Sequence, residues 1–140
     1  MRKMGPHCER LMRELRNCYP QPFSFMPNKS NYEAASTLVR YGFIEKVPNH
    51  NRTIRLTEYG RTVPTYIVKY TNKSDSPFSG MYQGPSGLCV NSGVITPHSS
   101  VLDKKDAYLY FSLVSASRAA RHCNDSWSGK VIQLNVLSEG

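Results

Sequence analysis

The second half of the chain contains a group of residues with the side-chain types of a hydrolytic triad. A triad needs its nucleophile on a strained strand-to-helix turn, within hydrogen-bond reach of a base. The spacing of this group provides no such turn, so we expect no catalytic residues there. The group consists of His98, Ser99, Ser100, Asp103 and Asp106.

Two further patterns imitate binding sites for cofactors. The glycine-rich residues 80–87 look like a phosphate-binding loop, but such a loop leads into a helix, and here a strand is expected to follow. The pairs His7-Cys8 and His122-Cys123 contain zinc-ligand side chains. Because neighbouring residues on a helix point about 100° apart, at most one of each pair reaches a single metal. The sequence therefore predicts no cofactor and no metal site.

Positive charge is the strongest pattern in the composition. The 140 residues include 18 Lys and Arg against 10 Asp and Glu, for a formal net charge of +8. Residues 1–70 hold twelve of these basic residues against five acidic ones, while residues 71–140 hold six against five. An excess confined to one half favours an anionic partner for that half. A basic face kept for solubility is the alternative.

The elements that position these charges begin with an amphipathic helix. Pro6 suits its first turn, and Pro20 ends it. The spacing i, i+4 predicts a supporting ion pair between Glu9 and Arg13. One arc of this helix carries the apolar side chains Met4, Cys8, Leu11, Met12, Leu15, Cys18 and Tyr19.

A second helix and a hairpin are expected next. Ser30 begins a Ser-x-x-Glu capping box at the start of the helix, and Gly42 suits a left-handed residue just after its end. Residues 43–47 and 52–56 alternate like two strands joined by turn residues. Thr57 is placed to cap one further short helical turn.

Residues 38–44 (LVRYGFI) and 52–60 (RTIRLTEYG) resemble winged helix-turn-helix proteins of the MarR-like and PadR-like types. The resemblance implies an α+β fold in which residues 1–63 form a winged-helix-like basic domain. The helix that begins at Ser30 would then be presented to the major groove of DNA. The hairpin loop that follows it would be the wing.

The resemblance also implies which side chains meet DNA. Hydroxyl and basic side chains of the presented helix are expected to reach phosphates, and Arg40 a phosphate or a guanine edge. The wing is expected to reach the backbone or the minor groove. Glu33 favours the alternative of a protein contact, because a carboxylate repels phosphate. The expected nucleic-acid-binding residues are Lys29, Ser30, Tyr32, Ser36 and Arg40 on the helix, Asn49, Asn51 and Arg52 on the wing, and Arg10 and Arg13 on the first helix.

The second half, residues 64–140, is expected to form a small α+β domain used for dimerisation or partner contact. Its predicted helix spans residues 112–122, and Gly129 is expected to break the chain before the last strand. The predicted strands are residues 65–70, 88–90, 93–96, 107–111 and 130–136.

The same half loosely resembles ADP-ribosyltransferase-like domains, in residues 93–97, 108–112 and 130–136. That resemblance implies an enzyme that consumes NAD, with Ser112 and Glu139 in two of the catalytic roles. It stands as an alternative to nucleic-acid binding.

Location and partners follow from what the sequence lacks. No apolar segment approaches the roughly 20 residues that cross a membrane, and no secretory signal is recognisable. The scattered cysteines are typical of free thiols in a reducing cell interior. We therefore expect a cytoplasmic protein.

Together with the charge and the winged-helix resemblance, this leads us to expect a non-enzymatic protein that binds double-stranded DNA, as a small transcriptional regulator and a homodimer. The alternative is a protein-binding inhibitor or adaptor, of viral or mobile-element origin, that acts on a larger nucleic-acid machine.

Overall fold

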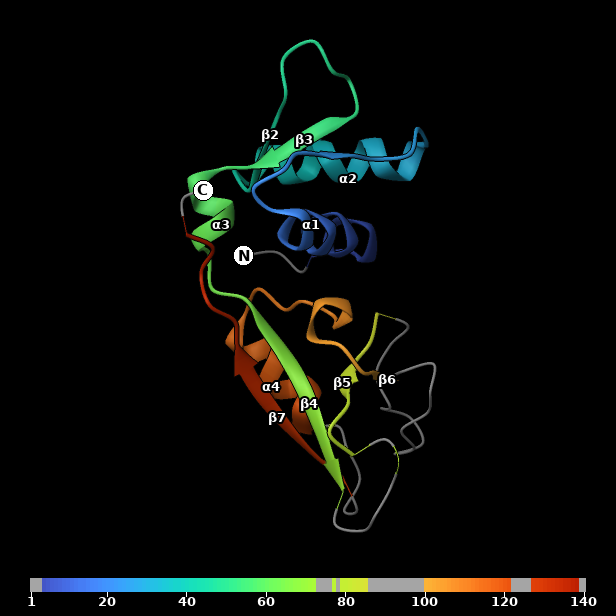
Figure 1. The fold of residues 1–140 in the computed structure, drawn as a ribbon, viewed down its shortest axis with the longest axis vertical. Coiled ribbons are helices and arrows are strands. Elements are labelled where there is room, and N and C mark those ends of the chain that lie inside the picture. Colours follow the sequence, from blue (N-terminus) through green and yellow to red (C-terminus); the bar gives the residue numbers. More distant parts are fainter. Residues whose placement is uncertain (1–3, 73–76, 78, 86–99, 122–126, 139–140) are drawn as a thin grey trace. The chain divides into compact units, whose positions relative to one another are not determined.

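The computed structural model describes residues 4–72, 77, 79–85, 100–121 and 127–138. Its helices and antiparallel sheets make this an α+β protein, as the sequence predicted. The chain divides into two compact units, and Figure 1 labels most of their helices and strands. Of the described residues, 4–63 and 136–138 form the first unit, and those from 64 to 135 form the second.

Helix α1 spans Pro6–Cys18 and begins at the predicted proline. Proline suits a first turn because the amide that it lacks would have no intrahelical partner there. Glu9 is buried with the apolar side chains, and its carboxylate accepts a hydrogen bond from Arg13 Nε at 3.0 Å, which confirms the predicted pair. The buried part of the apolar arc consists of Cys8, Leu11, Met12 and Leu15.

Helix α2 spans Lys29–Arg40 and is capped by Asn28, not by the predicted Ser30. The Asn28 side chain accepts a hydrogen bond from the Asn31 amide at 2.8 Å. Asn and Ser cap helices about equally well. The capping-box spacing therefore could not decide between Asn28 and Ser30 as the cap. The helix ends before Gly42, whose φ of +81° confirms the predicted left-handed residue. Figure 1 shows α1 and α2 side by side.

A three-stranded antiparallel sheet completes the first unit. Its strands β1 (Phe23–Ser24), β2 (Ile44–Lys46) and β3 (Thr53–Leu56) lie in the order β1-β3-β2. The β2–β3 hairpin falls within the two ranges that alternation predicted. β1 was not predicted, because a two-residue strand leaves no periodic pattern. Every residue between α1 and α2 is described, and β1 is the one regular element there.

Helix α3 (Glu58–Thr62) follows the hairpin, and Thr57 caps it as predicted. Thr57 Oγ1 accepts a hydrogen bond from the Gly60 amide at 3.0 Å and donates one to the Gly42 carbonyl. A Cβ at Gly60 would lie 1.9 Å from the Phe43 carbonyl oxygen. Glycine at this position therefore lets α3 pack directly against the start of the hairpin.

The second unit is built on a four-stranded antiparallel sheet in the order β6-β5-β4-β7. Helix α4 (Leu113–Arg121) packs against β4 and β7, and a 3₁₀ turn spans Lys104–Asp106. The strands are β4 (Tyr66–Asn72), β5 (Tyr82–Gln83), β6 (Ser100–Val101) and β7 (Trp127–Gln133). Val68, Tyr70 and Ala119 form the buried contact between the sheet and α4.

Two predictions for this unit are wrong. Residues 107–111 form no strand, and only an isolated bridge joins Tyr110 to Tyr66. The last strand runs over Trp127–Gln133 instead of residues 130–136, so Gly129 lies inside it.

Gly129 has a packing reason to stand within β7. A Cβ at this position would lie 2.6 Å from the Ala120 carbonyl oxygen, so glycine lets α4 approach the strand. Turn chemistry was the wrong interpretation of this glycine. The predicted strands at residues 88–90 and 93–96 lie outside the described residues.

The last described residues of the chain belong to the first unit. The Leu137 amide donates to the Arg61 carbonyl, and Arg61 Nη1 donates to the Leu137 carbonyl, both at 3.0 Å. The second unit therefore stops at residue 135, short of the predicted 140. In the part of the chain that the structure describes, no helix combines the length and apolarity needed to cross a bilayer.

Candidate nucleic-acid interface

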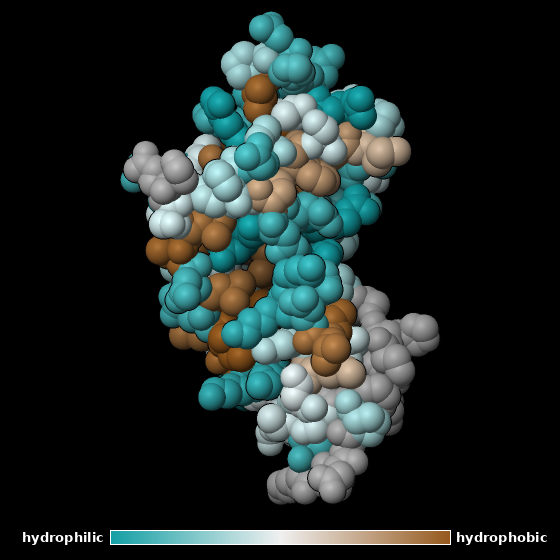
Figure 2. All heavy atoms as spheres, in the orientation of Figure 1, coloured by the Kyte–Doolittle hydropathy of each residue, from teal (hydrophilic) through white to brown (hydrophobic). Residues whose placement is uncertain are grey.

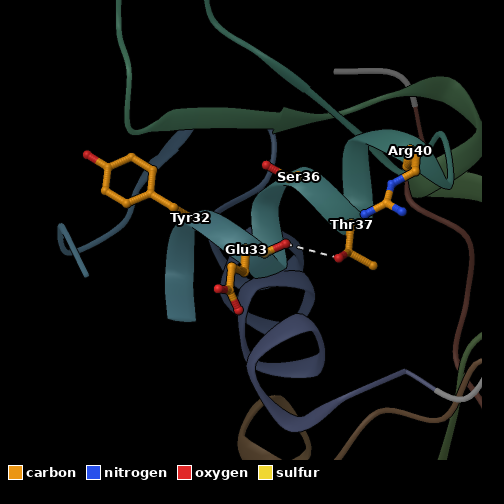
Figure 3. Close-up of a pocket in the computed structure, with 5 residues that line it drawn as sticks. All are labelled: Tyr32, Glu33, Ser36, Thr37 and Arg40. Carbon is orange, nitrogen blue, oxygen red and sulfur yellow. Dashed lines mark hydrogen bonds between the residues drawn. The ribbon is translucent and has the colours of Figure 1, made fainter. Parts of the chain in front are cut away.

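The outer face of α2 gathers three of the predicted contact residues. Its inner face is buried through Asn31, Ala34, Ala35 and Leu38. The outer face forms a shallow, open depression of ≈ 410 Å³, lined by Tyr32, Glu33, Ser36, Thr37 and Arg40. Figure 3 shows that all five side chains come from this one helix, with Tyr32 and Arg40 toward opposite ends. The structure therefore brings the predicted Tyr32, Ser36 and Arg40 to one surface.

Thr37 was missed as a member of this face. On a helical wheel it lies at the border of the outward arc, as Tyr32 does. Its Oγ1 donates a hydrogen bond to the Glu33 carbonyl at 3.0 Å, as the dashed line in Figure 3 marks. The hydroxyl is thus turned back along the helix.

Lys29 and Ser30 lie in the first turn of α2 and are exposed, but they do not line the depression. Lys29 Nζ lies 3.9 Å from Glu33 Oε1, one turn further along the helix. The Lys29 side chain is 90% exposed and that of Glu33 is 67% exposed, so water screens this ion pair. Lys29 offsets the charge of Glu33 and can still turn toward another anion.

Arg40 and Lys46 carry positive charge without an internal partner. Within the residues that the structure describes, neither side chain makes a hydrogen bond or an ion pair, and both residues are exposed. Lys46 lies at the end of β2, within a predicted strand, and was not among the predicted contact residues. An anion can bind these two side chains without breaking a hydrogen bond or ion pair among the described residues.

The hairpin loop presents the residues predicted for the wing. Asn49, at φ +66°, forms the turn, and the Val47 amide closes the loop by donating to the Thr53 carbonyl at 2.9 Å. Asn49, Asn51 and Arg52 are all exposed. Arg52 Nη1 donates to the Phe25 carbonyl at 3.2 Å, which tethers the guanidinium to the loop before α2. Figure 2 shows mostly hydrophilic surface at this end of the first unit.

The arginines of α1 have structural contacts. Arg10 is exposed, but its Nη2 donates to Asn31 Oδ1 at 2.6 Å. Arg13 pairs with Glu9, and its side chain is only 13% exposed. Arg13 does not add to a surface for phosphate as predicted, because the buried Glu9 carboxylate holds its guanidinium. Burial also lowers the pKa of Arg16.

Two of the residues weighed for catalysis cap local turns. Asp103 Oδ1 accepts from the Lys105 amide at 3.2 Å in the 3₁₀ turn, and Ser112 Oγ accepts from the Ser115 amide at 3.4 Å at the start of α4. His98, Ser99 and Glu139 lie outside the described residues.

The glycine-rich residues 80–87 do not lead into a helix over their described part, since β5 lies within it. No group of three or more His, Cys, Asp or Glu side chains is arranged to hold a metal among the residues described.

The first unit is thus a helix pair backed by a small sheet, with a polar helix face beside a hairpin loop. Hydroxyl, guanidinium and ammonium groups on these two elements are suited to hydrogen bonds with phosphates and base edges. Comparisons of the chain with protein-family models, with curated proteins and with solved structures find no match.

Proposed function

We propose that the first unit binds double-stranded DNA without catalysing a reaction, with α2 in the major groove and the hairpin loop against the phosphate backbone. The observation that carries the proposal is the outer face of α2, where Tyr32, Ser36 and Arg40 share one surface. The major groove of B-DNA admits one α-helix. A role as a small transcriptional regulator would follow from such binding.

The contacts behind α2 support its use as a presented element. Asn28 caps the helix, and Nδ2 of the Asn31 side chain donates a hydrogen bond to the Met26 carbonyl at 2.9 Å. Arg10 joins the same asparagine to α1. A helix held at its first turn loses little conformational freedom when a ligand binds its outer face.

The charges of the interface also support an anionic ligand. Lys29, Lys46 and Arg52 are exposed on α2 and the hairpin, and Arg40 adds a fourth positive charge. The carboxylate of Glu33 lies beside Lys29, which offsets it. The remaining positive field attracts a phosphate backbone more strongly than it attracts an uncharged ligand of the same shape.

A protein partner is the second candidate, and the exposure of Met26 favours it. Met26 lies just before α2 and is 72% exposed, while Tyr32 is 42% exposed. Apolar and aromatic side chains of this kind are enriched in protein interfaces. In this alternative the chain acts as an inhibitor or adaptor of a larger nucleic-acid machine.

Fluorescence anisotropy of a labelled DNA duplex, titrated with the full chain at several salt concentrations, tests the proposal. Lys29, Lys46 and Arg52 would supply about three phosphate contacts, so the logarithm of the affinity should fall against that of the salt concentration with a slope of about −3. A flat dependence, or no binding at about 50 mM salt, overturns the proposal. Retention of one defined protein partner with no response to duplex DNA supports the alternative.

A further inference from the structure

Glu33 is the residue on the outer face of α2 that general attraction to DNA does not explain. Its carboxylate lines the depression together with Ser36 and Arg40. The ion pair with Lys29 is long, at 3.9 Å, and exposed, so it fixes the glutamate only weakly. A carboxylate at this position opposes binding to phosphate, and it therefore calls for a ligand group that donates hydrogen bonds.

The spacing of Glu33 and Arg40 places them along one line of the helix. The two residues are seven positions apart, which is close to two full turns. At 1.5 Å per residue they are separated by about 10 Å along the helix axis. Base pairs in B-DNA follow each other at about 3.4 Å, and a helix in the major groove lies oblique to the DNA axis, so this separation matches roughly two to three base-pair steps.

The major groove offers one complementary group to each side chain. Cytosine presents its N4 amino group, a donor that Glu accepts, and guanine presents the O6 and N7 acceptors that Arg grips with two hydrogen bonds. Ser36 lines the same depression, and its hydroxyl can donate or accept a hydrogen bond.

We propose that Glu33 and Arg40 are specificity-determining residues that read a cytosine and a guanine about two to three base pairs apart. The inference rests on the proposed DNA binding of the first unit and names the sequence feature that this surface recognises. Glu33 lowers the affinity for any duplex through its charge and restores it where cytosine N4 meets the carboxylate.

Selection of duplexes from a randomised pool, with the full chain and its variants, tests this inference. The wild type should enrich sites that hold the cytosine and the guanine at that separation. Glu33→Gln should lose the preference at the cytosine position by about fivefold or more while keeping the guanine. The same variant should bind an arbitrary duplex more tightly, because a negative charge has been removed. Arg40→Ala should lose the guanine preference.

Glu58→Gln is the matched control, since Glu58 is an exposed glutamate in the first turn of α3, away from this face. Its selected sites should equal those of the wild type. A wild type that retains duplexes in a salt-dependent way but enriches no base, or a Glu33→Gln profile identical to that of the wild type, overturns the inference and leaves DNA binding standing. Absence of any duplex retention overturns the proposed function itself, and the inference with it.

Discussion

Arg10 Nη2 donates a hydrogen bond to Asn31 Oδ1 at 2.6 Å and so joins α1 to the first turn of α2. Asn31 is buried, and its Nδ2 donates to the Met26 carbonyl at 2.9 Å. One asparagine therefore links the two helices and the segment between them. The orientation of the outer face of α2 depends on this link.

We predict that Asn31→Ala destabilises the first unit by about 1–3 kcal/mol, because it removes the two hydrogen bonds that the buried side chain makes with Arg10 and with the Met26 carbonyl. Hydrogen exchange of the α2 amides should speed up accordingly. Asn51→Ala, at an exposed position in the hairpin loop, is the control and should leave the exchange unchanged. Equal protection in all three proteins would show that the link carries no stability.

The two arginine–glutamate pairs of the first unit should differ in strength. Arg13→Ala removes two hydrogen bonds that the guanidinium donates to the buried Glu9 carboxylate and should destabilise the unit by about 3 kcal/mol. Arg55→Ala breaks a pair with Glu45 in which both side chains are half exposed, and should cost under about 1 kcal/mol. Urea unfolding followed by circular dichroism measures both. Equal losses would contradict the assigned burial.

The elements of the first unit were predictable where one residue type fixes the backbone. Proline at the start of α1, Gly42 after α2 and Thr57 before α3 each act through local chemistry that the sequence displays. The cap of α2 was not predictable, because Asn28 and Ser30 are comparable capping residues and the capping-box spacing favoured Ser30. β1 exists through its pairing with β3, a partner about 30 residues away.

The glycine in β7 gives a test of the second unit. Gly129→Ala should weaken the packing of α4 on the sheet, because the new Cβ would meet the Ala120 backbone. The fluorescence of Trp127, which lies in the same strand, should report unfolding at a lower urea concentration. Ser128→Ala, at an exposed neighbouring position, should leave the midpoint in place. An unchanged midpoint for Gly129→Ala would contradict the close approach of α4.

We predict that titration of the Cys8 thiol lowers the unfolding free energy of the first unit at alkaline pH. Burial raises its pKa in the folded chain, and its Sγ contacts the Ala34 carbonyl at 3.7 Å. The unfolded chain therefore gives up this proton first, so the contribution of Cys8 is complete below about pH 8.5 and declines as the pH rises through the folded value. Cys8→Ser removes the titrating group, and the difference in unfolding free energy between pH 8 and 10 should shrink. An equal pH dependence in the two proteins would contradict this role.

The outer face of α2 was predictable in part. Helical spacing correctly grouped Tyr32, Ser36 and Arg40, because outward positions of a helix follow from its period. The Glu9–Arg13 pair followed from its spacing, but its burial did not. A glutamate that is buried in the fold looks the same in a sequence as one that faces solvent. Lys46 was missed because its lack of a partner depends on where the charges of neighbouring strands lie.

The salt dependence of duplex binding by Lys29→Ala, compared with that of Lys105→Ala, tests the DNA-binding surface most directly. The two lysines are matched, since each is exposed and each lies 3.9 Å from a carboxylate, Lys29 in the first unit and Lys105 in the second. We predict that Lys29→Ala makes the slope of log affinity against log salt shallower by about 0.9, while Lys105→Ala leaves it at the wild-type value. Equal slopes for the wild type and Lys29→Ala, or a loss confined to Lys105→Ala, would contradict binding through α2.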